Sequence, residues 1–170
     1  MDVRVICLSS IAQFATVKDD FLAIYQWVKE GVGKGESHLD VPIKVKYSLV
    51  VAIYGCPFYF IDEKNALKEL ASKDDKSDDA TRLEYGCNAA NPDPKNKEKI
   101  WEWYLSKDKK VSADLKIASF MAFFHSSQDL SEYVTKFFKD IPTLMDDSTI
   151  RRVADAFFVI MCPKGKDETY

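Results

Sequence analysis

Apolar residues recur every three or four positions along most of the chain, which is the spacing of amphipathic α-helices. Six prolines and six glycines punctuate the chain and fall between these periodic segments. The sequence therefore predicts short helices joined by tight turns. The first two apolar stripes are Val5, Leu8, Ile11 and Phe14, followed by Phe21, Ile24, Tyr25 and Val28.

Residues that favour helix ends predict where the individual helices start and stop. Thr16 and Asp19 resemble a capping box, in which each side chain bonds a free backbone N–H at the start of a helix. A third helix is expected over 43–54 after Pro42, and Pro142 is expected to end the eighth. The caps expected for the other helices are Asp62, Ser77, Asp93 with Pro94, Ser112, Ser126 or Ser127, and Asp146 or Asp147.

The last four predicted helices each carry an apolar stripe. In the first of them, Trp101 and Tyr104 share one helix face whereas Trp103 points elsewhere. We expect core packing for Trp101 and Tyr104, and a groove or partner contact for Trp103. The stripes of the other three are Leu115, Ile117, Ala118, Met121 and Phe124; Leu130, Tyr133, Val134, Phe137 and Phe138; and Ile150, Val153, Phe157, Ile160 and Met161.

About nine short helices with tight turns predict an all-α fold of stacked antiparallel helix pairs, a HEAT- or armadillo-like α-solenoid. We expect one domain over 1–163 and a flexible tail over 164–170. Two segments could also form strands, because 44–48 alternates and 157–161 is rich in β-favouring residues. Helical spacing flanks both segments and neither has a hairpin partner, so the helical interpretation is favoured.

Composition narrows the function classes. The 170 residues carry a net charge of -3 with acidic and basic residues interspersed, which argues against nucleic acid as a partner. The chain has no apolar run of the ~20 residues that a membrane span needs. Its four cysteines form no C-x-x-C pair, which favours free thiols in a reducing compartment. We expect a cytoplasmic protein, or one of another soluble compartment.

Candidate catalytic residues are few. The HExxH motif of zinc peptidases is absent, and the two histidines, His38 and His125, share no local motif. His125 is expected at the C-terminal end of a helix, where a positively charged imidazole could interact favourably with the helix dipole. Cys56 lies between Gly55 and Pro57, which could expose it, but a packed thiol is favoured. The sequence thus predicts no catalytic, metal or cofactor residue in this chain.

Two further patterns have simple structural interpretations. The glycine-rich segment 31–35 lacks the spacing of a phosphate-binding loop and follows a helix, so it predicts a flexible connection. Four acidic pairs precede or begin predicted helices, where they cap the helix or compensate its dipole. The pairs are Asp19 and Asp20, Asp74 and Asp75, Asp78 and Asp79, and Asp146 and Asp147.

One series of residues resembles a known family. It begins with Ala89, Ala90 and Pro92, and continues with Lys97 and Trp101. Its second part comprises Gln128, Leu130, Tyr133, Val134, Phe137, Phe138, Ile141 and Pro142. In this order the residues resemble the C-terminal helical domain of zinc aminopeptidases, the group that includes aminopeptidase N and the puromycin-sensitive and endoplasmic-reticulum enzymes. The likeness covers most of 39–163.

The resemblance implies a bowl of armadillo/HEAT-type helix pairs that caps a zinc domain, encloses a cavity and governs which peptides reach the metal. The zinc motif of such enzymes and the Gly-x-Met-Glu-Asn motif lie in an earlier domain and are absent here. The implied zinc therefore belongs only to a catalytic domain outside this chain, and no family catalytic residue is implied here.

Partners and alternatives follow from this expectation. The implied partners are the catalytic domain of an aminopeptidase, or another protein, bound through the N-terminal helices or the concave face, together with peptides. The first helix is expected to expose an apolar flank that includes Val3, Ile6 and Phe14. A stand-alone helical interaction subunit is the main alternative, and an enzyme with an unrecognised site is a third.

Overall fold

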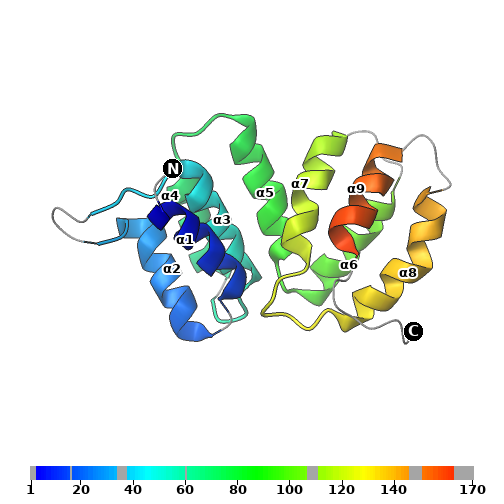
Figure 1. Cartoon of the computed structure of the whole chain (residues 1–170), viewed down its shortest axis with the longest axis horizontal. Helices are drawn as coiled ribbons and strands as arrows, with labels where there is room; N and C mark the ends of the chain where they lie inside the picture. Colours follow the sequence, from blue (N-terminus) through cyan, green and yellow to red (C-terminus); the bar gives the residue numbers. More distant parts are fainter. Residues whose placement is uncertain are drawn as a thin grey trace.

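A computed structural model describes residues 3–15, 17–33, 38–59, 61–106, 111–145 and 151–162, with side chains for all of these except 4, 5, 9, 12–14 and 143. Within these ranges the chain forms nine helices and no strand; Val32 and Leu39 form an isolated bridge. The all-helical prediction is confirmed, and both 44–48 and 157–161 are helical (Figure 1). The helices are α1 (Val3–Phe14), α2 (Lys18–Glu30), α3 (Ile43–Gly55), α4 (Ile61–Ser72), α5 (Asp78–Ala90), α6 (Pro94–Leu105), α7 (Ala113–Phe123), α8 (Ser131–Met145) and α9 (Arg151–Met161).

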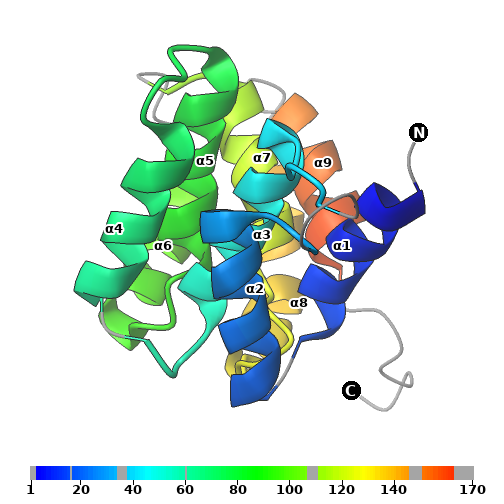
Figure 2. The same ribbon diagram turned by 90° about the vertical axis from the view of Figure 1, so that its left-hand side faces the viewer.

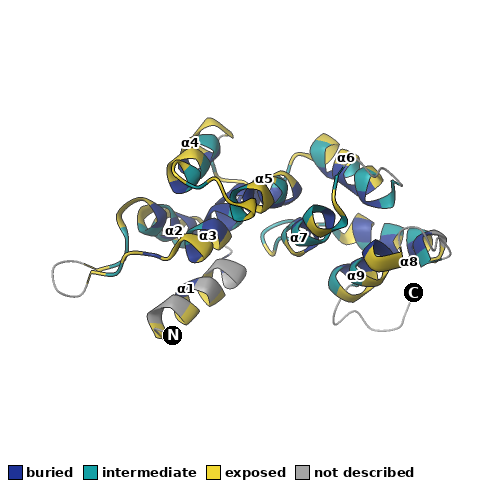
Figure 3. Ribbon diagram, turned by 90° about the horizontal axis from the view of Figure 1, so that it is seen from above, coloured by how far each residue is buried: buried dark blue, intermediate teal, exposed yellow. Residues whose placement is uncertain are grey.

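Helices α3, α5, α7 and α9 form the central row of the molecule. Each of α3, α5, α7 and α9 packs against the next, while α2 and α4 pack on α3, α6 on α5, and α8 on α9. Seen along this row, α4 and α6 lie on one side and α1 lies on the other (Figures 2 and 3). This arrangement is the repeat-like stacking of short helices that the sequence predicts.

Three of the predicted helix starts are confirmed by hydrogen bonds of the capping side chain. The Ser77 hydroxyl accepts a bond from the Asp79 N–H (3.2 Å), and the Asp93 carboxylate accepts one from the Asn96 N–H (2.8 Å). The Ser112 hydroxyl accepts one from the Leu115 N–H (3.4 Å). Each cap needs only residues within one helical turn, which is why the local sequence predicts it.

Two predicted caps are wrong. Asp62 is the second residue of α4 and not its cap. Ser126 and Ser127 lie in the turn before α8, because Ser127 donates a hydrogen bond to the distant carbonyl of Gly55 (3.2 Å). Instead, the Asp129 carboxylate accepts a bond from the N–H of Ser131, the first residue of α8 (3.1 Å).

The predicted end of α8 is also wrong, since Pro142 lies inside this helix. Proline lacks an N–H and leaves one helical carbonyl without its partner. Pro142 is on the exposed side of α8, where water can bond that carbonyl. The second helix begins one residue later than expected, with the Val17 N–H donating to the Asp20 carboxylate (3.3 Å). Thr16, the Asp146 and Asp147 pair, Ile150 and the segment 163–170 lie outside the described residues.

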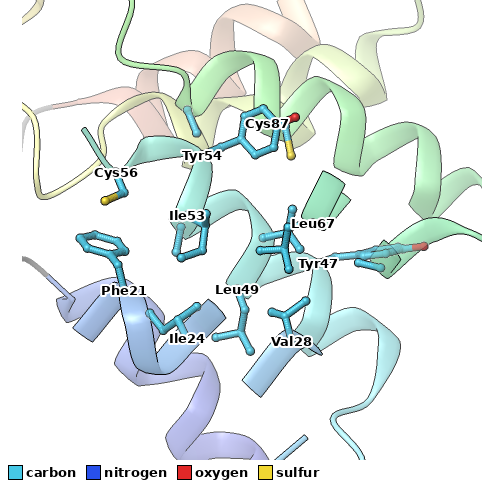
Figure 4. Close-up of a cluster of buried hydrophobic side chains, with 14 of the residues drawn as sticks. Phe21, Ile24, Val28, Tyr47, Leu49, Ile53, Tyr54, Cys56, Leu67 and Cys87 are labelled. Atoms are coloured by element: carbon cyan, nitrogen blue, oxygen red, sulfur yellow. The ribbon is translucent and has the colours of Figure 1, made fainter. Parts of the chain in front are cut away.

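Two hydrophobic clusters form the core. The first joins α2, α3 and α4 and includes Phe21, Ile24, Leu49, Ile53 and Leu67 (Figure 4). The second lies between α6, α7, α8 and α9 and is rich in aromatic rings. Its rings come from Trp101, Tyr104, Phe120, Phe123, Tyr133, Phe137 and Phe157. Ala122 on α7 packs against both clusters, and α5 contributes Ala90 to the first and Ala89 to the second, so the clusters meet at α5 and α7.

The predicted buried face of α7 is wrong. The fully buried residues of this helix are Lys116, Ser119, Phe120 and Phe123, whereas Met121 is 72% exposed. The helix is apolar around most of its circumference, so the spacing of apolar residues does not mark one face. The choice is made by the neighbouring helices α5 and α9, which pack on either side of it.

Candidate functional site

Four of the residues that carry the family resemblance, Ala89, Ala90, Lys97 and Gln128, meet where α3, α5 and α7 end. Ala89 and Ala90 close α5, and Lys97 and Trp101 lie on α6. Gln128 lies in the connection 124–130 between α7 and α8. Tyr133 and Phe137 face the core from α8, but Phe138 is half exposed and Pro142 is exposed. Pro92 lies half-buried in the turn after α5.

Lys97 joins the ends of two helices from inside the protein. Its side chain is buried, and its ammonium donates hydrogen bonds to the carbonyls of Ala89 (2.7 Å) and Phe123 (2.6 Å). Carbonyls at a helix C-terminus have no partner within the helix and carry the negative end of its dipole, which a cation stabilises. Burial away from water lowers the pKa of Lys97 to about 7.

Gln128 connects the ends of α3 and α5. Its side-chain amide donates to the carbonyls of Gly55 (2.7 Å) and Ala90 (2.7 Å). Together with the bond from Ser127 to Gly55, these contacts fasten the α7–α8 connection across two helix ends. The residues are distant in sequence, so these contacts belong to the tertiary structure.

His125 packs against the same helix end. A methyl group at Gly55 would overlap the His125 ring, so this position needs glycine. The Ser127 N–H donates to Nδ1 of His125 (3.3 Å). Burial, with the nearby ammonium groups of Lys97 and Lys64, lowers the pKa of His125 to about 4. The imidazole is therefore neutral at pH 7, which contradicts the interpretation that its charge favours the helix dipole.

Two further buried lysines act as Lys97 does, and the sequence analysis missed both. Lys64 donates to the carbonyls of Tyr54 (2.9 Å) and Cys56 (2.5 Å), and Lys116 donates to the carbonyl of Ser106 (2.9 Å). Lys64, Lys97 and Lys116 each stand at the fourth position of their helix, and each bonds the end of the helix before it. That shared position is the sequence signal that could have found them.

The tryptophans differ as their positions predict. Trp101 is buried, donates from Nε1 to the Asp140 carboxylate (3.0 Å), and contacts the rings of Tyr133 and Phe157. Trp103 is half-buried and stacks on Tyr85, with ring centroids 5.6 Å apart. Trp103 therefore packs against other residues of this chain, and its contact with a groove or a partner stays a prediction.

Cys56 is not placed to act as a nucleophile, whereas the Ser127 hydroxyl lies 2.8 Å from Nδ1 of His125. Cys56 is fully buried, so the packed interpretation is confirmed, and burial raises the pKa of its thiol. His38 lies on the α2–α3 connection beside Asp40, with Nε2 and the carboxylate 3.2 Å apart, and is not joined to His125. Among the described residues, no group of three or more His, Cys, Asp or Glu side chains could hold a metal ion.

A groove of about 580 Å³ crosses the three central helices α3, α5 and α7. At one end lie Lys44, Asp79 and Arg82, and at the other His125 and Ser126. The Asp79 carboxylate pairs with both cations, at 2.8 Å from Arg82 Nη1 and 3.5 Å from Lys44 Nζ. Most of the remaining lining is apolar or small: Tyr47, Ser48, Val51, Ala52, Leu83, Gly86, Ala118, Met121, Ala122 and Phe124.

The sequence did not reveal this groove because its walls come from three helices. The sequence places Met121 in the apolar stripe of its helix, whereas the structure leaves this side chain exposed at the groove.

No protein-family model matches this chain, and no curated protein matches it. Within the described ranges, every helix is too short or too polar to pass through a lipid bilayer.

Proposed function

We propose that the chain is a non-catalytic helical domain of a zinc aminopeptidase, which covers the active site and controls the access of peptides to it. The observation that carries the proposal is the junction at the ends of α3, α5 and α7. Lys97 bonds Ala89, Gln128 bonds Ala90, and Trp101 packs on Tyr133. Six of the residues that resemble the family motif are therefore partners of one another, which supports the proposal with a physical reason for their order.

The surface of α1 supports a contact with a further domain. Val3 is 71% exposed and Ile6 is 50% exposed, as the sequence predicts, and Ile11 is also exposed. The side chain of Phe14 lies outside the described residues. Val3 and Ile6 are one helical turn apart, and exposed apolar neighbours of this kind are typical of a surface that another protein covers.

The proposal can be tested by mixing the purified chain with the zinc domain of an aminopeptidase from the same organism. We expect a complex on size-exclusion chromatography, and hydrolysis of long peptides that differs from that of the zinc domain alone. The double variant Val3→Asp/Ile6→Asp should abolish the complex. Val159→Asp, at an exposed valine of α9, is the matched control and should leave it intact.

A stand-alone interaction subunit remains the second candidate, and the groove across α3, α5 and α7 favours it. Stacked helix pairs often bind their partners on such surfaces. The absence of a complex with the zinc domain, together with recovery of an unrelated partner from cells, would favour this candidate. Hydrolysis of peptides by the purified chain alone, with its metal content measured, would contradict both candidates.

A further inference from the structure

The groove across α3, α5 and α7 has the size of a binding site for a short piece of polypeptide. Its volume of about 580 Å³ lies within the ~300–1,000 Å³ of typical ligand sites. From Lys44 to Ala52, both on its α3 wall, the helix rises about 12 Å at ~1.5 Å per residue. An extended chain advances ~3.3 Å per residue, so about four residues fit along it.

The two ends of the groove differ in charge. Among the residues that line the α3 and α5 end, two cations, Lys44 and Arg82, face the single carboxylate of Asp79. The carboxylate of Asp75, outside the lining, is bonded to the Tyr47 hydroxyl (2.6 Å). At the other end His125 is neutral at pH 7, because burial lowers its pKa to about 4. Arg82 has five N–H donors and gives one of them to Asp79, so its planar group has donors for a second carboxylate.

The walls between these ends are apolar and are built of small residues on two helices. Gly86 on α5 and Ala118 and Ala122 on α7 leave room for the side chains of a ligand. Met121, 72% exposed, gives the groove a flexible apolar wall. The Lys44 side chain is 81% exposed, so this end is not closed and a chain can continue past it.

We propose that this groove binds an extended apolar segment of a partner protein, with a Glu or Asp side chain of that segment held between Lys44 and Arg82. The open end favours a side chain of a continuing polypeptide over a chain terminus. The choice of a polypeptide rests on the proposed function, whereas the position of the carboxylate rests on the charges of the groove alone.

Fluorescence anisotropy with the whole purified chain tests the proposal. The probe is an acetylated, amidated and fluorescein-labelled peptide with four central apolar residues and a Glu on each side, so that its direction does not matter. Matched peptides carry Gln or Lys in place of Glu, and a further Gln peptide has a free terminal carboxylate. We expect the Glu peptide to bind at least about tenfold more tightly than the Lys peptide, with the Gln peptides between them.

Three variants locate the site. Arg82→Glu should remove the preference for Glu over Lys, and Ala118→Trp should abolish binding by filling the groove. Arg151→Glu, at an exposed arginine of α9 that is paired with Asp155, is the control and should change neither result. Because Ala118→Trp could disturb folding, Met121→Glu at an exposed position provides a second block, and circular dichroism checks each variant.

The outcomes are distinct. The proposal would be overturned if no peptide bound at about 1 mM, roughly the weakest affinity of interest. It would also be overturned if the Glu and Lys peptides bound equally well, or if binding needed the free terminal carboxylate. Binding that survives both Ala118→Trp and Met121→Glu would also overturn it. These measurements use the chain alone, so their failure is separate from a failure to form a complex with the zinc domain.

Discussion

At the scale of single residues, Gly55 and His125 show how one small side chain makes room for a large one. Gly55 ends α3, and the His125 ring occupies the space where any other residue would place its Cβ atom. The same glycine carbonyl accepts the bonds from Ser127 and Gln128, so the ring and these two side chains meet at one point.

Gly55→Ala should lower the free energy of unfolding by about 1–3 kcal/mol, because the added methyl group overpacks the His125 ring. Urea denaturation measures the change. The double variant Gly55→Ala/His125→Ala should be less unstable than the sum of its two single variants, since the overlap is gone. Strict additivity of the two effects would contradict the contact.

The lowered pKa of His125 makes the protein sensitive to acid. Its pKa is about 4 in the folded chain against an ordinary value of 6.5. Between these pH values the unfolded chain binds a proton that the folded chain does not, so stability falls as the pH drops from 6.5 towards 4. We expect His125→Gln to reduce this loss by about 2–3 kcal/mol, measured as the difference between denaturation curves of the two proteins at pH 7 and pH 4.5.

At the scale of the helices, the structure shows which features a sequence can predict. Ser77, Asp93 and Ser112 start their helices through bonds within one turn, and local sequence is sufficient for them. The predicted helix start at Ser126 or Ser127 is wrong because this segment is held by hydrogen bonds to Gly55, which is distant in sequence. The predicted buried face of α7 is wrong because the neighbouring helices determine it.

The candidate sites follow the same division. Trp101 and Lys97 could be singled out from the sequence only through a family resemblance that stays a prediction. The groove could not, since no local motif records which residues of α3, α5 and α7 face one another. Lys64 and Lys116 were overlooked because lysines on helices are usually exposed.

Trp101 on α6 should be a main determinant of the C-terminal core. Trp101→Ala should cost about 3–5 kcal/mol, because it removes a buried indole that contacts Phe123, Tyr133 and Phe157. Trp103→Ala on the same helix is the control and should cost clearly less, since Trp103 is half-buried. Chemical denaturation followed by circular dichroism measures both, and a loss under ~1 kcal/mol for Trp101→Ala would contradict its role.

Lys97 should stabilise the junction of α5, α6 and α7 through its hydrogen bonds. Lys97→Met keeps the length of the side chain but leaves the carbonyls of Ala89 and Phe123 without their donor. We expect a loss of about 1–3 kcal/mol in the free energy of unfolding. Lys99→Met, at an exposed position of the same helix, should change it by less than ~0.5 kcal/mol.

At the scale of the whole molecule, the α7–α8 connection fastens the two hydrophobic clusters together. Gln128, between two helices of the second cluster, bonds Gly55 and Ala90 at the ends of two helices of the first cluster. The clusters otherwise meet through α5 and α7, which pack closely side by side. The molecule thus has polar contacts where α3 and α5 end, in addition to the apolar contacts between the sides of the helices.

Gln128→Ala should therefore weaken the coupling between the two clusters more than it weakens either one. We expect hydrogen exchange to rise in α3 and near the end of α5, while the aromatic core around Trp101 stays protected. Gln26→Ala, at an exposed position of α2, is the control and should leave exchange unchanged. A uniform rise in exchange over the whole chain would contradict a local fastening.

The three lysines at the fourth position of their helices have a consequence for how such a chain can change over evolution. Each lysine bonds the helix immediately before it, so a helix and the group that secures its end are neighbours in the gene. Duplication or deletion of the unit that holds Lys64 or Lys116 carries the hydrogen bond with it, whereas Lys97 also bonds Phe123 and ties its unit to α7. A stack built this way can lengthen or shorten without inventing a new joint, even after its apolar positions have diverged beyond a recognisable repeat.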